Sequence, residues 1–139
     1  MQSVTVETNV QSGVEKVWQY WNEPEHIKNW YFASDDWHAP EAANDLRVGG
    51  SFTIKMAAKD GSFGFDFEGK YLAVELNKYI CYTLADERKV EIQFIATANA
   101  TQIIETFDVE NENPIEMQKD GWQMILNNFK RYVESLNKI

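Results

Sequence analysis

The chain has 139 residues, of which 44% are hydrophobic and 14% aromatic, so it can bury a core as a single domain covering residues 1–139. Its formal charge of −9 offers no basic stripe to neutralise phosphates, and we predict no binding to nucleic acid. The sequence contains no run of 18 apolar residues and no basic-then-apolar start. We therefore expect no membrane insertion and a cytoplasmic location.

The first part of the sequence predicts a strand followed by two short helices. Residues 2–10 alternate between apolar and polar side chains, as in a half-buried strand. Helical spacing over residues 14–22 follows Ser12 and Glu15, a pair typical of a capping box. Pro24 marks the first turn of a second short helix. Its apolar side is predicted to carry Ile27, Trp30 and Tyr31.

From residue 37 onward the sequence predicts an antiparallel meander. Runs rich in aromatic and β-branched residues are separated by turn signals, of which Asp60-Gly61 is the strongest. Six strands are expected, at residues 37–43, 51–59, 62–76, 79–85, 89–98 and 101–110. In the strand at residues 62–76, alternation sends Phe63, Phe65, Phe67 and Tyr71 to one face, which we expect to line a cavity.

Residues 114–136 have the spacing of a long amphipathic helix. Asn113 is placed to cap this helix, and Pro114 suits its first position. Gly121 costs about 1 kcal/mol relative to alanine in a helix interior, and we interpret it as leaving space. The predicted apolar stripe consists of Met117, Gly121, Ile125, Phe129, Tyr132 and Leu136, widened by Trp122, Leu126 and Val133.

These elements together predict an α+β fold. An antiparallel sheet with one apolar face needs cover, and the C-terminal helix is the only predicted element large enough to supply it. We expect a curved antiparallel seven-stranded sheet wrapped around the long C-terminal helix, with two short helices between strands 1 and 2.

Six segments, spread over nearly the whole chain, carry a family resemblance. They are GVEKVWQYWNEPEHIKNWY, SDDW, NDLRVGGSF, DGSFGFDFEGKY, ETFDVE and GWQMILNNFKRYVE. In this order and spacing they resemble the activator of heat-shock-protein ATPase-like branch of the START and polyketide-cyclase (SRPBCC) superfamily, whose fold is called a helix-grip. The resemblance implies a deep cavity between the concave sheet and the terminal helix, which the superfamily uses for lipids, polyketides and other apolar ligands.

The sequence offers little for metal or covalent chemistry. His26 and His38 are the only histidines, and the acidic residues near His38 are typical of a solvated loop. Cys81 has no evident histidine partner, and no serine lies in a GxSxG turn. We predict no metal and no cofactor.

Glu105 is the candidate polar group of the predicted cavity. It shares a strand face with Ile103 and Phe107, and the terminal helix should cover that face. Burial would raise its carboxyl pKa and prepare it as a general acid or base. Alternatively, Glu105 lies at a strand edge or pairs with a cation such as Lys55.

The preferred functional hypothesis is a carrier or sensor, monomeric or homodimeric, that binds a small apolar or aromatic molecule. One alternative is a cyclase- or hydrolase-type enzyme that uses Glu105 as its acid or base. Another, suggested by the family name, is a co-chaperone-like interaction module with a chaperone partner. The predicted cavity wall consists of Trp30, Trp37, Phe52, Met56, Phe65, Phe67, Tyr82, Glu105, Phe107, Met117, Gly121 and Ile125.

Overall fold

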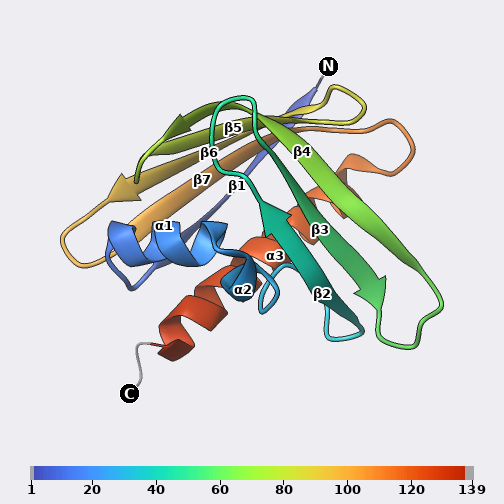
Figure 1. Cartoon of the computed structure of the whole chain (residues 1–139), viewed down its shortest axis with the longest axis horizontal. Coiled ribbons are helices and arrows are strands. Elements are labelled where there is room, and N and C mark those ends of the chain that lie inside the picture. The colour runs from blue at the N-terminus through green and yellow to red at the C-terminus, as the bar shows by residue number, and fades with distance from the viewer. Residues whose placement is uncertain (1, 137–139) are drawn as a thin grey trace.

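A single curved sheet lies over three helices in the computed structural model, which describes residues 2–136 (Figure 1). The elements are β1 (Ser3–Val10), α1 (Val14–Asn22), α2 (Pro24–Ile27), β2 (Trp37–Asn44), β3 (Ser51–Ala58), β4 (Gly64–Glu75), β5 (Tyr79–Leu84), β6 (Lys89–Ala96), β7 (Thr101–Asp108) and α3 (Ile115–Leu136). The seven strands pair antiparallel in the order β1-β7-β6-β5-β4-β3-β2. The predicted helix-grip fold is confirmed.

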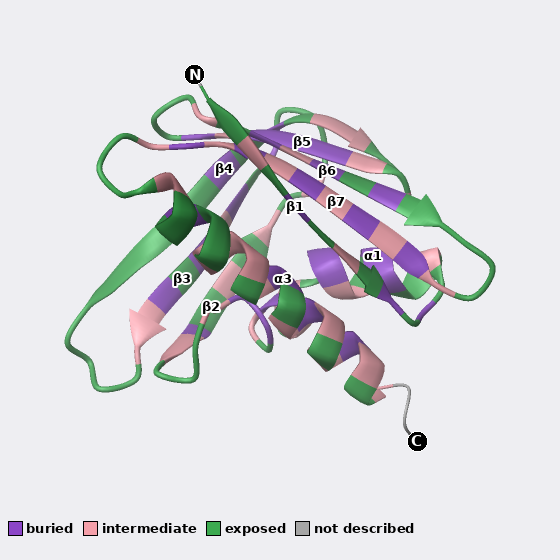
Figure 2. Ribbon diagram, turned by 180° about the vertical axis from the view of Figure 1, so that it is seen from behind, coloured by how far each residue is buried: buried purple, intermediate pink, exposed green. Residues whose placement is uncertain are grey.

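The concave face of the sheet forms the core together with α3. Along β7, buried side chains alternate with partly exposed ones, as the purple and pink bands of Figure 2 show. In Figure 1, α3 crosses beneath the sheet, and α1 and α2 lie beside its C-terminal half. The strand period therefore brings every second β7 side chain under the cover of the helices.

Three aromatic rings join the helical layer. Trp21 of α1, Trp30 after α2 and Phe129 of α3 have pairwise ring-centroid distances of 4.6 to 4.9 Å and tilted or edge-to-face geometry. Trp30 and Phe129 are fully buried. Such ring contacts add stability beyond the area they bury. Trp30 is thus a core residue that holds the helices together.

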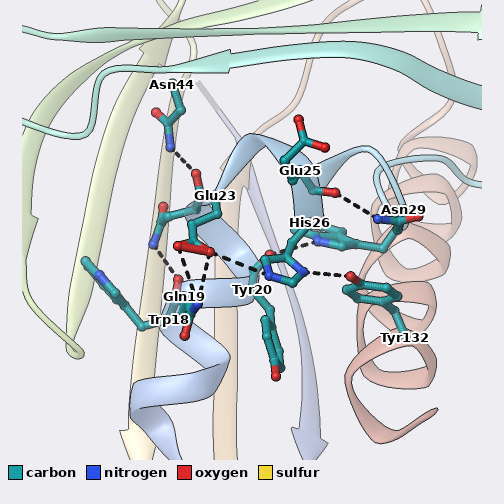
Figure 3. A network of polar contacts seen from close by, with 11 residues as sticks. Trp18, Gln19, Tyr20, Glu23, Glu25, His26, Asn29, Asn44 and Tyr132 are labelled. Carbon is teal, nitrogen blue, oxygen red and sulfur yellow. Dashed lines mark hydrogen bonds and ion pairs between the residues drawn. The ribbon is translucent and has the colours of Figure 1, made fainter. Parts of the chain in front are cut away.

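Polar contacts connect α2 to α3 and the end of α1 to β2 (Figure 3). Nδ1 of His26 and the hydroxyl of Tyr132 lie 2.7 Å apart, which connects α2 to α3. Nδ2 of Asn44 in β2 donates to the backbone carbonyl of Asn22 at 2.8 Å. These bonds hold the two short helices in place, and Tyr31 lies in the segment that follows α2.

Both predicted caps need correction. The N-cap of α1 is Gly13, with no side-chain cap bond, and the buried hydroxyl of Ser12 has no hydrogen-bond partner among the described residues. At α3, the amide of Gln118 donates to the carbonyl of Pro114, so Pro114 precedes the first helical residue. The Asn113 side chain bonds Glu110 instead of the helix. Tertiary contacts have displaced the local capping pattern.

The buried face of α3 is rotated around the helix axis relative to the predicted apolar stripe. Its buried side chains are Gln118, Leu126, Phe129 and Val133. Met117, predicted to face the sheet, is 60% exposed, so its assignment to the cavity wall is wrong. The helix carries more apolar side chains than one stripe can hold, and contact with β1 and the concave sheet selects among them.

The two glycines Gly121 and Gly69 should respond in opposite ways to alanine. A Cβ at Gly121 would meet no atom within 4 Å, so Gly121→Ala should stabilise the protein by up to about 1 kcal/mol through helix propensity. A Cβ at Gly69 would lie 2.6 Å from Cζ of Phe52, so Gly69→Ala should destabilise it by about 1–3 kcal/mol. Urea unfolding measures both, and equal effects would contradict this assignment.

Candidate ligand-binding cavity

A cavity of about 220 Å³ lies between the sheet and α3. Its walls come from α1, the segment after α2, β3, β4, β7 and α3, so elements far apart in the sequence meet there. Arg88, in the turn between β5 and β6, also contributes. The lining side chains are Trp21, Tyr31, Met56, Phe65, Phe67, Arg88, Glu105, Trp122 and Ile125.

The β3–β4 pair forms the aromatic wall of this cavity. Met56 and Phe65 are directly paired across the two strands, which places their side chains on the same face. The Phe67 ring lies 5.6 Å from that of Tyr31 and 6.0 Å from that of Trp122. Phe65 is 44% exposed, so it lies on the solvent side of the cavity.

Trp122 closes the cavity from the helix side. Its indole stacks on the Phe107 ring of β7, with centroids 4.2 Å apart and planes 7° from parallel. Phe107 is fully buried behind it and does not line the cavity. The stacked pair fixes the orientation of the indole, so this part of the wall is formed before any ligand binds.

Glu105 provides a buried acid in the cavity. It is 4% exposed, and the residues directly opposite on the neighbouring strands are Val6 and Ile92. No hydrogen bond or ion pair to its carboxyl group occurs within residues 2–136, and desolvation raises its pKa to about 8. Glu105 is therefore largely protonated at neutral pH.

The two alternative interpretations of Glu105, a position at a strand edge and an ion pair with Lys55, are wrong. Its strand β7 lies between β1 and β6, so Glu105 is not at a sheet edge. Lys55 is an exposed residue of β3 and makes no ion pair with Glu105. The neighbouring strands supply apolar side chains instead, and these account for the desolvation.

Two buried phenols lie near this acid. Burial raises the pKa of Tyr31 and of Tyr82 well above the ordinary value, and both phenols interact electrostatically with Glu105. Tyr31 lines the main cavity. It also borders a second, inner cavity of about 30 Å³, which Phe52 and Tyr82 help to line. The polar end of the site thus consists of neutral O–H groups.

Arg88 places a cation at the cavity wall. Its side chain is 19% exposed, and its Nε lies 2.7 Å from Oδ2 of Asp86. This ion pair is formed within one tight turn and holds the guanidinium in position. The nearby carboxylate of Asp86 offsets much of its charge.

The structure brings part of the predicted wall together. Met56, Phe65, Phe67, Glu105 and Ile125 line the main cavity, whereas Phe52 and Tyr82 line the inner one. Five predicted residues line neither. Trp30 lies in the ring cluster with Trp21 and Phe129, Trp37 contacts Phe63 and Phe65, Phe107 lies behind Trp122, Met117 is exposed, and Gly121 faces open space.

Sequence reasoning missed four lining residues, Trp21, Tyr31, Arg88 and Trp122. Trp21, Tyr31 and Trp122 were recognisable as apolar positions of predicted helices, but not as cavity residues. The second predicted helix ends at Ile27, so Tyr31 lies after it and not on its apolar side. Phe63 is 62% exposed and lines neither cavity, which corrects the prediction that every aromatic residue of that strand faces the cavity. It lies in the β3–β4 turn, just before the start of β4.

No three His, Cys, Asp or Glu side chains within residues 2–136 are grouped so that they could hold a metal ion. No helix in the same part of the chain is both long and apolar enough to cross a membrane.

A curved seven-stranded sheet gripping a terminal helix over an internal cavity defines a helix-grip protein of the START/SRPBCC class. Within that class, the family model described as "Activator of Hsp90 ATPase homolog 1-like protein" matches residues 11–134. The chain therefore belongs to this family, and the resemblance seen in the sequence is confirmed.

Solved structures agree with this assignment. The AHSA1-like protein from Aeromonas hydrophila is 43% identical, with a TM-score of 0.92 over 98% of this chain and 94% of that one. A protein from Cytophaga hutchinsonii is 54% identical, with a TM-score of 0.83 over 99% and 96% of the two chains. A protein from Nitrosomonas europaea, 18% identical with a TM-score of 0.82 over 99% and 97%, shares the fold. No protein of curated function matches the chain.

Proposed function

We propose that this protein binds a small apolar or aromatic molecule in the cavity between the sheet and α3. The observation that carries the proposal is the combination of an aromatic wall with one buried acid that has no hydrogen-bond or ion-pair partner among the described residues. Ligand sites are typically apolar pockets in which a few polar groups orient the ligand. The cavity volume of about 220 Å³ exceeds the roughly 150 Å³ that accommodates benzene, so a ligand of one or two rings suits it.

The carrier hypothesis is preferred over acid–base catalysis because of the ionisable groups in the cavity. Exchange of protons between an acid and a base needs two groups that titrate near the working pH. Glu105 has a pKa of about 8, whereas burial holds Tyr31 in its protonated form and Arg88 is engaged by Asp86. These side chains are better suited to binding an oxygen atom than to moving protons.

The carrier hypothesis is also preferred over the hypothesis of an interaction module that docks on another protein. A protein-docking surface would gather exposed apolar side chains into one patch of several hundred Å². Among the large exposed apolar residues of the described chain, Phe63 and Phe65 have rings 6.2 Å apart beside the β3–β4 turn. The others lie on the loop before β3, β4, the β4–β5 turn, β6 and α3, namely Val48, Leu72, Leu76, Ile95, Met117 and Met124. Activation of the Hsp90 ATPase, which the family description mentions, is therefore not part of the proposal.

Toluene binding tests the proposal directly. Titration of the protein with toluene, followed by amide NMR shifts, should show saturable binding with the largest shifts around Met56, Phe67 and Ile125, which line the cavity. Ile125→Trp should fill the cavity and reduce the affinity at least tenfold, because the larger ring occupies the ligand volume.

Met117→Trp is the matched control, since it adds the same ring to the same helix at a 60% exposed position. It should bind toluene like the parent protein. Circular dichroism establishes that both variants are folded. Absence of saturable binding by the parent protein, or equal binding by the two tryptophan variants, would refute a ligand site in this cavity.

A further inference from the structure

We propose that Glu105 and Tyr31 form a pair of O–H donors for one acceptor oxygen of the ligand, so that the cavity selects small apolar ketones and aldehydes over hydrocarbons and amines. This inference rests on the proposed function and specifies its ligand class. A carbonyl oxygen carries two lone pairs and can accept from two donors at once.

The geometry supports a shared oxygen site. Glu105 and Tyr31 line the same cavity, Glu105 from β7 and Tyr31 from the segment that follows α2. Glu105 is 4% exposed, and its carboxyl group makes no hydrogen bond or ion pair within residues 2–136. Leaving such a group unsatisfied is costly, and a ligand that supplies the missing bond regains that free energy.

The surroundings keep this donor site neutral. The strands on either side place Val6 and Ile92 opposite Glu105, and α3 contributes Trp122 and Ile125. The charged or titratable groups that face it are Tyr31, Tyr82 and Arg88, the last paired with Asp86. None of these is a carboxylate that could share the proton of Glu105.

The protonated acid favours an acceptor over a cation. Desolvation raises the pKa of Glu105 to about 8, so near pH 6 the group carries its proton. A carboxylic acid kept neutral by apolar surroundings can donate a hydrogen bond to a ligand oxygen, as known oxyanion-binding sites show. An amine would require the carboxylate form, which burial disfavours.

Acetophenone and α-methylstyrene provide a matched pair of probes, because they differ only in C=O against C=CH₂. Affinities at pH 6, measured by isothermal titration calorimetry, should favour acetophenone about tenfold, as expected for a net hydrogen-bond contribution in a buried site. Glu105→Leu and Tyr31→Phe should each reduce this preference. Glu105→Gln, whose amide still donates, should retain part of it.

The preference for acetophenone over α-methylstyrene should be lost as the pH rises. Below pH about 8 Glu105 is protonated and the preference is constant; above it the carboxylate faces the carbonyl oxygen and the preference is lost. In Glu105→Gln the preference should not change between pH 6 and pH 9.5.

The other possible outcomes would overturn either the donor pair alone or the ligand site as well. Equal binding of the two probes would overturn the donor pair and leave the proposed apolar site standing. Tightest binding of 1-phenylethylamine would show Glu105 to be a counter-ion, and tightest binding of benzoate would assign recognition to Arg88, so either would overturn it too. Failure of every probe, toluene included, would refute the ligand site itself and the inference with it.

Discussion

Replacing Glu105 with glutamine should raise the free energy of unfolding at pH 9 by about 5 kcal/mol and change it little near pH 4. The cause is the buried carboxyl group, whose pKa rises from an ordinary 4.5 to about 8 on folding. Between these values the folded protein holds a proton that the unfolded chain has released. Stability should therefore fall by about 1.4 kcal/mol per pH unit from about pH 4.5 to about pH 8 and level off above.

Urea unfolding of the parent and Glu105→Gln proteins from pH 4 to pH 9 measures this difference. The glutamine side chain has nearly the same shape and no charge, so it removes the proton linkage and keeps the packing. Glu68→Gln is the matched control, because Glu68 is an exposed residue of β4. A stability difference for Glu105→Gln that stays constant over this range would show that the carboxyl group is not desolvated.

Phe129→Ala should have the other large effect, a loss of about 3–5 kcal/mol of stability. The Phe129 ring is fully buried and contacts Trp21 and Trp30, with centroids 4.9 and 4.6 Å away. Its removal leaves a hole where three helical segments meet. Since a whole domain is typically stable by about 5–15 kcal/mol, a large share of the folding free energy would be lost.

Phe129→Ala should also impair ligand binding in the cavity. Trp21, which contacts Phe129, forms part of the cavity wall, so Phe129→Ala should weaken toluene binding as well as shift the urea midpoint. Phe129→Leu, which leaves a smaller void, should cost clearly less, and Met124→Ala at a 47% exposed position should cost at most about 0.5 kcal/mol. If Phe129→Ala behaved like Met124→Ala, the ring cluster would not carry the helix contacts.

Local sequence patterns determined the order of the elements and most of their bounds. Each predicted strand agrees with the structure to within two residues at either end, because the turn signals between the strands are strong. The alternation of Ile103, Glu105 and Phe107 was enough to place Glu105 on the buried face, since a strand has a period of two. Family resemblance added the helix-grip topology.

The tertiary structure alone decided which of these buried side chains form the cavity. The long helix has apolar residues on more than one face, and its contacts with the sheet decide that Trp122 lines the cavity whereas Met117 is exposed. Stacking on Phe107 then fixed the Trp122 indole, and chain folding brought Tyr31 and Arg88 to the same cavity. Glu105 has no polar partner on the adjacent strands because strand pairing places Val6 and Ile92 opposite it. Those two residues belong to other strands, and no local sequence pattern encodes which residues pair across a sheet.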